Sequence, residues 1–253
     1  MLLISPIFFP IVFGACMLAF VTGMVMLKRK KRAIRTTLME QLSQQLNLSF
    51  APADTNGFGK LLQGFDLFKR ERRKWGVGGK VTNVMSGQVG DAQVYLFDYS
   101  YIISNGKSAQ EIRQTVFFAN NNKWSLPHFS LKPENWWRKV MQKIGMANDI
   151  NFPENPDFSD RFWLTGGIES MIREQFNPEI QAFLSERPPA NIEGNNFYLI
   201  AYKPRTVLDA AQAKTFFEHC CQLTEMMQKK EGNALLELAE LKSPIPIEME
   251  KGG

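Results

Sequence analysis

The sequence predicts an α+β protein in which one N-terminal transmembrane helix precedes a cytosolic domain with an antiparallel meander sheet and packing helices. Three patterns predict this fold class. The first 27 residues carry no charged side chain and are followed at once by five cations. Residues 93–103 are dense in the aromatic and β-branched side chains that favour strands. Later segments space apolar residues three and four apart, which is typical of amphipathic helices.

The run from Leu2 to Leu27 contains few polar residues and no charge. About 20 apolar residues, rising ~1.5 Å each, cross a hydrocarbon core of ~30 Å. We therefore expect residues 1–27 to form a transmembrane anchor. A cleaved signal peptide and a lipoprotein signal at Cys16 are the alternatives. Both are disfavoured, because the charge follows the apolar run instead of preceding it and the run continues past Cys16.

A basic cluster borders the apolar run on its C-terminal side. Its six members are Lys28, Arg29, Lys30, Lys31, Arg32 and Arg35. The positive-inside rule then predicts a single-pass protein with its N-terminus outside and its C-terminal domain in the cytoplasm. Cations beside an anionic leaflet gain about 1 kcal/mol each. We therefore expect this cluster to contact the bilayer surface through anionic lipid headgroups.

The basic balance of the chain does not indicate a nucleic-acid-binding protein. The net charge is +5, but the excess lies in two clusters and the remainder is acidic. The second cluster, in residues 69–74, contains Lys69, Arg70, Arg72, Arg73 and Lys74. It is a candidate patch for an anionic partner or for the same membrane surface. A solvated loop is the alternative, because charge runs are usually solvated faces.

Cysteine usage argues against a disulfide framework and against a zinc site. Cys16 lies in the expected anchor, Cys220 and Cys221 are sequence neighbours, and no C-x-x-C spacing occurs. Adjacent cysteines rarely bridge, and the pattern fits a reducing compartment. We expect neither a metal nor another cofactor.

The part after the anchor divides into a basic juxtamembrane segment with a stalk helix at 28–50, an α+β domain at 51–242 and a disordered tail at 243–253. Four apolar residues at a spacing of four predict the stalk helix over 33–47: Ile34, Leu38, Leu42 and Leu46. We expect this stripe to pack on its own domain, with pairing to a second copy as the alternative. The tail contains two prolines and no core pattern.

Strands are expected mainly in the first half of the domain, after a loop at 51–60. Aromatic and β-branched residues predict them at 80–85, 93–103, 112–119, 124–131 and 197–202. Turn residues at 87–91, 104–107 and 120–122 separate them. Short turns between neighbours indicate an antiparallel meander.

Helices are expected at 133–145, 166–175, 178–186 and 206–229, with a short one at 235–241 and a loop at 148–160. Asn177 caps the third of these, with Pro178 at its first position. Thr206 and Asp209 resemble a capping box at the start of the longest helix. That helix is expected to bury the stripe formed by Phe216, Cys220, Leu223 and Met227.

A series of short motifs follows in order through residues 94–203. They are Leu96-Phe97-Asp98-Tyr99, Gln114-Thr115-Val116, Leu126-Pro127, Phe129-Ser130-Leu131-Lys132-Pro133, Asp149-Ile150, Phe158-Ser159, Leu164-Thr165-Gly166 and Ile192-Glu193-Gly194. In this order they resemble a group of uncharacterised bacterial single-pass membrane-anchored proteins. The resemblance implies a bacterial inner-membrane protein with a cytosolic domain, and it brings no catalytic residue.

No catalytic or metal motif stands out. The two histidines, His128 and His219, have no triad pattern around them, and no G-x-S-x-G elbow occurs. Residues 76–80 lack the spacing of a phosphate loop. Residues 149–160 offer the oxygens of a calcium loop but not its glycine or its terminal glutamate.

Three functions remain as hypotheses. The first is a non-enzymatic interaction or adaptor domain that binds another protein or a membrane component. The second is an enzyme that uses carboxylates such as Asp91 or Asp98 with Glu111. The third is a module that binds anionic lipid headgroups through residues 69–74 and 138–143. A buried carboxylate pair in a concave pocket favours the enzyme, and an exposed apolar patch favours the adaptor.

Overall fold

The structure, a computed structural model, describes residues 8–55, 57–69, 79–104, 107–134 and 149–241. Its centre is an eight-stranded antiparallel sheet with the strand order β1-β2-β3-β4-β8-β7-β5-β6. The strands are β1 (Ser49–Ala53), β2 (Lys80–Val89), β3 (Ala92–Ser104), β4 (Ala109–Asn120), β5 (Leu126–Pro133), β6 (Phe162–Gly166), β7 (Asn191–Asn196) and β8 (Tyr198–Tyr202). The described helices are α1 (Phe8–Gln45), the 3-10 helix η1 (Phe58–Gly64), α2 (Asp66–Lys69), α4 (Pro156–Arg161), α5 (Glu169–Gln175), α6 (Pro178–Ser185) and α7 (Ala210–Leu241).

The sheet is a meander only as far as β4. The next strand in space is β8, which pairs with β4 from Val116↔Tyr202 to Asn120↔Tyr198. The chain after β4 does not form a tight hairpin, because the amide of Asn121 donates to the carbonyl of Phe197 and the next segment buries Trp124. The fold class expected from the sequence is therefore wrong in its simple meander, since β8 and β7 lie between β4 and β5.

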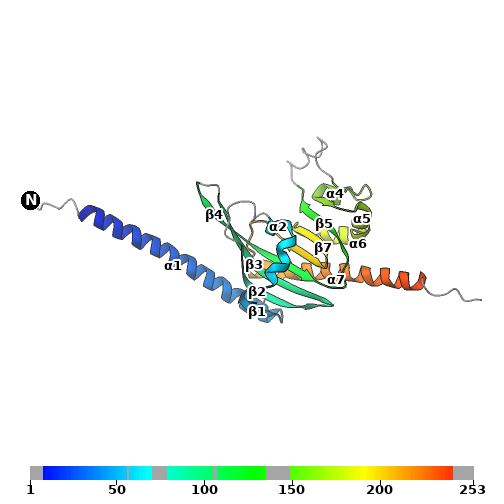
Figure 1. The fold of residues 1–253 in the computed structure, drawn as a ribbon, viewed down its shortest axis with the longest axis horizontal. Coiled ribbons are helices and arrows are strands. Elements are labelled where there is room, and N and C mark those ends of the chain that lie inside the picture. The colour runs from blue at the N-terminus through cyan, green and yellow to red at the C-terminus, as the bar shows by residue number, and fades with distance from the viewer. Residues whose placement is uncertain (1–7, 56, 70–78, 105–106, 135–148, 242–253) are drawn as a thin grey trace, which may run out of the picture.

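Neighbouring residues of a strand point to opposite faces of the sheet. Apolar residues occupy both faces. Leu96 and Phe117 belong to the core beneath α1 and α7, whereas Phe97 and Phe118 belong to the core beneath η1 and α2. Figure 1 shows α7 crossing the sheet, and α4, α5 and α6 gathered near β5 and β7.

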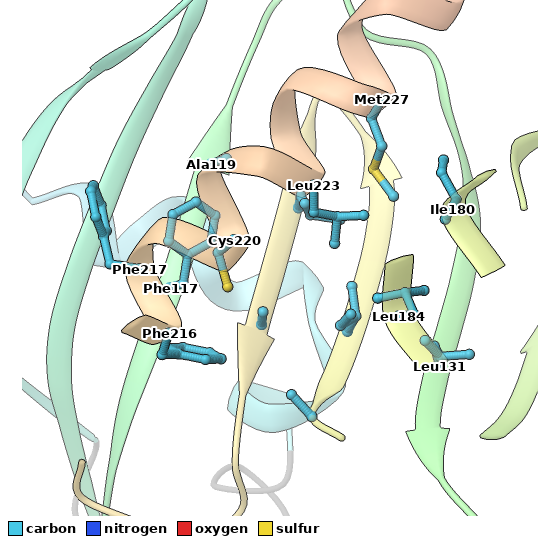
Figure 2. Packing of buried hydrophobic residues seen from close by; sticks show 14 of the residues in the cluster. Phe117, Ala119, Leu131, Ile180, Leu184, Phe216, Phe217, Cys220, Leu223 and Met227 are labelled. Carbon is cyan, nitrogen blue, oxygen red and sulfur yellow. The ribbon is translucent and has the colours of Figure 1, made fainter. Parts of the chain in front are cut away.

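The buried stripe expected on the longest helix is confirmed. The helix that carries this stripe is α7, and Figure 2 shows the α7 stripe beside the sheet residues Phe117 and Ala119 and the α6 residues Ile180 and Leu184. The stripe consists of Phe216, Cys220, Leu223 and Met227, all buried. The capping box lies three residues later than expected. The amide of Asp209 donates to the side chain of Gln212 at 3.2 Å, and the amide of Gln212 donates to the side chain of Asp209 at 2.9 Å. The helix also continues without a break to Leu241.

In the part of the chain that the structure describes, helix α1 contacts the domain through its C-terminal part. The side chains that turn toward the sheet are Arg35, Met39 and Leu42, followed by the partly buried Leu46 just past the helix end. This spacing of 4, 3 and 4 follows one face of a helix. Ile34 and Leu38, which the expected stripe included, precede that face by one residue and are 51% and 42% exposed. Figure 1 shows the N-terminal part of α1 projecting away from the sheet.

The predicted membrane anchor is contradicted. Within the ranges that the structure describes, no helix combines the length and the apolar character needed to cross a membrane. The single-pass topology, the inner-membrane location and the outside N-terminus, which all rested on that anchor, fall with it.

Several elements differ from those expected. Strand β1 lies in the expected loop at 51–60, and α4 lies in the expected loop at 148–160. Strands β6 and β7 were not expected. The expected helix at 133–145 and tail at 243–253 lie almost wholly outside the described residues, although Pro133 itself ends β5. Because α1 is continuous, the expected boundary between residues 27 and 28 falls inside one helix.

Candidate functional site

A polar pocket of about 240 Å³ lies where α1 meets strands β2, β3 and β4. We call it the junction pocket. Its lining residues are Arg32, Thr36, Pro52, Lys80, Thr82, Asn83, Asp98, Ser100, Glu111 and Arg113. Asp98 and Glu111, one of the carboxylate pairs considered from the sequence, therefore lie in the same pocket. Asp91 does not line it and pairs with Lys123 at 2.7 Å on the surface.

The central contact of the pocket is a two-bonded ion pair between Arg35 of α1 and Asp98 of β3. The Nε and Nη2 atoms of Arg35 each donate to one carboxylate oxygen at 3.0 Å. The pair is buried, with 11% of the Arg35 side chain and 2% of the Asp98 side chain exposed. Planar pairing of this kind is among the strongest and most directional contacts that arginine makes. It fixes both the position and the rotation of α1 on the sheet.

A β-bulge in β2 supplies the next partner. Asn83 and Val84 together face one residue of β3, between the pairs Thr82↔Asp98 and Met85↔Leu96. Asn83 has a φ of 52°, a left-handed conformation that asparagine tolerates better than most residues. Its side-chain amide donates to Asp98 at 2.9 Å, and its carbonyl accepts from Thr36 of α1 at 2.8 Å.

Thr115 of β4 completes the surroundings of Asp98. Its hydroxyl donates to Asp98 at 3.1 Å and accepts from the amide of Leu208, just before α7, at 3.0 Å. Asp98 and Thr115 are direct cross-strand partners. Four elements of the fold, α1, β2, β4 and the segment before α7, are thus joined through one carboxylate.

A second, more exposed ion pair lies one helical turn earlier. The Nη2 atom of Arg32 lies 2.9 and 3.0 Å from the two carboxylate oxygens of Glu111. The two side chains are 55% and 40% exposed. Exposed pairs of this kind contribute little to stability. Of the two ion pairs, Arg35–Asp98 therefore contributes more to the attachment of α1.

The hydrogen bonds of Asp98 occupy both of its carboxylate oxygens. Each carboxylate oxygen accepts about two hydrogen bonds. Oδ1 accepts from Arg35 and Thr115, and Oδ2 accepts from Arg35 and Asn83. A general base needs a free lone pair within reach of a substrate proton. These four hydrogen bonds occupy the acceptor positions of Asp98, so its carboxylate is used in holding α1 on the sheet.

The residues of the two basic clusters lie in different surroundings. Arg32 and Arg35 bind carboxylates of the sheet, while Lys28, Arg29, Lys30 and Lys31 lie exposed on α1. Of the second cluster, Lys69 ends α2, and Arg70, Arg72, Arg73 and Lys74 lie outside the described residues. Contact of either cluster with lipid headgroups or another anionic partner is untested.

Other chemistry considered from the sequence finds no support in the described part of the chain. No group of three or more His, Cys, Asp or Glu side chains there is placed to hold a metal ion. Asp149 accepts the amide of Leu164 at 3.1 Å, and Asn155 caps α4. His128 lies exposed in β5, and His219 lies on α7.

Sequence reasoning identified Asp98 and Glu111 but missed Asn83, Thr36 and Thr115. Asp98 and Thr115 each lie in a motif of the family resemblance, and the register of β3 and β4 brings these two motifs together. Nothing in the periodicity of β2 marks Asn83 as a bulge residue. The partner arginines come from a helix 63 and 79 residues earlier in the chain.

No family model and no curated protein matches the chain. A solved structure similar to it is that of the mycobacterial trehalose monomycolate transport factor A, TtfA. The match covers 76% of this chain and 95% of that one, at 11% sequence identity and a TM-score of 0.48. A likeness at this level carries no argument about function.

Proposed function

We propose that this chain is a non-catalytic interaction module in which the domain holds α1 in a fixed orientation for a protein partner. The observation that carries the proposal is the saturation of Asp98. The most deeply buried acid of the junction pocket is fully used in attaching α1 to the sheet. This supports a mechanical role over a chemical one.

The projecting part of α1 supplies the binding surface. Phe13, Leu18, Phe20 and Met26 are 60–71% exposed along this segment. Contiguous apolar surface on a folded protein marks an interaction site. An apolar helix that enters a hydrophobic groove is a recurring mode of protein recognition. The partner we propose is accordingly a protein with an apolar groove.

Site-specific photo-crosslinking in cells tests this proposal. We expect a photoreactive phenylalanine at position 20 to give a protein adduct of one defined mass. The same group at Thr37, which is exposed on the attached part of α1, is the matched control and gives no such adduct. Val21→Glu places a charge on the apolar segment and removes the adduct from position 20.

Variants of the Arg35–Asp98 pair provide a second test in the same crosslinking experiment. If the domain orients α1, Asp98→Asn weakens the adduct at position 20 while Glu111→Gln leaves it unchanged. Adducts with lipid alone, or protein adducts of many masses that Val21→Glu does not alter, would overturn the proposal.

A further inference from the structure

A second concave site lies away from α1, where the N-terminal half of α7 meets the end of β8 and the segment between α6 and β7. It is a cleft of about 450 Å³, within the range of small-molecule sites. A smaller cavity of about 40 Å³ adjoins it and extends toward the core. The two share Pro188, Phe216 and His219 in their walls. We call them together the α7 cleft.

The floor of the α7 cleft is apolar. Leu208 and Phe216 are buried beneath it, and Figure 2 shows Phe216 and Cys220 on the side of α7 that faces the sheet. Ala211 and Thr215, one helical turn apart, also line the cleft. Their short side chains leave room above Phe216. A hydrocarbon chain placed here would cover apolar surface of Phe216 and Leu208.

The rim of the cleft carries positive charge. Lys203 lines the mouth, and Arg187 lines the smaller cavity. The Nη atoms of Arg187 donate to the carbonyl of Phe183 at 2.7 Å and to Gln222 at 3.2 Å. Its Nε atom is buried and has no hydrogen-bond partner among the described residues. Arg187, which also stacks on the Phe183 ring at 3.5 Å, therefore adds positive charge beside the cleft.

The pKa of His219 responds to this positive charge. Burial, and then the neighbouring charge of Arg187, lower the pKa of its imidazole, and Lys203 acts in the same direction. Glu218 opposes them but does not reverse the shift. Glu186 lies 3.7 Å from Arg187 with 76% of its side chain exposed, so solvent screens much of its charge.

We propose that the α7 cleft binds a small amphiphilic monocarboxylate, such as a medium-chain fatty acid. The carboxylate lies between Lys203 and His219 at the mouth, and the hydrocarbon chain lies over Phe216 and Leu208. This site uses no residue of α1 or of the junction pocket. The amide of Leu208 does donate to Thr115 of the Asp98 network, but ligand binding in the cleft does not rest on the interaction function proposed above.

The experiment is a titration of the full chain with octanoate, observed through the ring protons of the two histidines by NMR. We expect the His219 signals to shift and the pKa of His219 to rise, because a bound carboxylate favours the imidazolium form. His128, exposed in β5, is the internal control and stays unchanged. Octanol and octylammonium, which share the chain but not the charge, bind more weakly.

Three variants locate the site. Lys203→Glu reverses the charge at the mouth and weakens octanoate binding by about tenfold or more, a cost of ~1.4 kcal/mol or more. Ala211→Trp fills the cleft and abolishes the His219 shift. Lys214→Glu, an equal charge change at an exposed α7 residue outside the cleft, leaves binding unchanged. Octylammonium binding as tightly as octanoate, or an unchanged His219 shift in Ala211→Trp, would overturn the proposal.

Discussion

Asp98 shows how a single side chain can determine the placement of a whole helix. The desolvation of its charge is offset by the Arg35 guanidinium and by two further donors, Asn83 and Thr115. In Asp98→Asn the guanidinium stays buried without a counter-charge. We expect this variant to lose about 3–5 kcal/mol of unfolding free energy. Urea denaturation with unchanged m-value measures the loss.

Glu111→Gln is the matched control for that measurement. It removes the same charge from the neighbouring ion pair, which is 40% exposed on the Glu111 side. An exposed pair contributes ~0–1 kcal/mol, so we expect a loss within that range. Equal losses in Asp98→Asn and Glu111→Gln would contradict the assignment of the attachment to Arg35 and Asp98.

The thiols provide a second prediction at the residue scale. Burial, and then the charges of Glu225 and Glu218, raise the pKa of Cys221 from 9.0 to about 12. Only the thiolate reacts with alkylating reagents. At pH 8 we expect the exposed Cys16 to be labelled rapidly, the partly exposed Cys221 slowly, and the buried Cys220 only when the fold opens. Mass spectrometry after timed alkylation distinguishes the three.

The raised pKa of Cys221 also makes the stability of the fold depend on pH. The folded state holds the Cys221 proton more tightly than the unfolded chain does. The resulting stability is fully present below pH 9 and is lost as the pH rises from 9 toward 12. Cys221→Ser should flatten this alkaline loss in urea melts. Unchanged alkaline behaviour in that variant would contradict the assignment to Cys221.

At the scale of elements, Gly166, the last residue of β6, and Gly167, which follows it, test how tightly that edge strand packs. A Cβ on Gly166 would lie 2.4 Å from the backbone oxygen of His128, whereas one on Gly167 would meet nothing within 4 Å. Forcing an atom into a packed position costs ~1–3 kcal/mol. We expect Gly166→Ala to lose that much stability and Gly167→Ala to lose none. Thermal melts of the two variants make the comparison, and equal melting temperatures would contradict it.

The elements that sequence reasoning found are those whose own composition decides them. Strand β3 is long, aromatic and β-branched, and α6 has both an Asn177 cap and a first-turn proline. Strand β7 reads Asn-Ile-Glu-Gly-Asn-Asn, a poor strand composition. It is held by pairing on both sides, and its buried Glu193 accepts hydrogen bonds from Tyr202 and the amide of Asp66. These tertiary partners are invisible in the local sequence.

The candidate site shows the same division. Two acids could be selected from the sequence because carboxylates are conspicuous. Their partners could not, because Arg32 and Arg35 appear in the sequence only as members of a basic cluster. Pairing across 63 residues requires one particular rotation of α1, and the buried Met39 and Leu42 on the same helix face support that rotation by packing. A charge pattern alone cannot reveal that rotation.

At the scale of the whole molecule, the sheet supports two separate attachments. Helix α1 packs on β1 and β2 at one edge, whereas α4, α5 and α6 pack near β5 and β6 at the other. Helix α7 contacts α1, α6 and strands β2, β3 and β4, so it bridges the two. Because the two attachments lie at opposite edges of the sheet, we expect that losing the α1 attachment does not open the far edge.

Hydrogen exchange of Asp98→Asn tests this separation. Without the ion pair, we expect amides of α1 after Arg32 and the bulge around Asn83 to exchange faster, because their tertiary support is lost. The amides of β5 and β6, including Ser130 and Thr165, should keep their protection, because no residue there contacts Asp98. Glu111→Gln should exchange like the unsubstituted chain. Uniformly faster exchange across the sheet would instead mean that the α1 attachment and the far edge open as one cooperative unit.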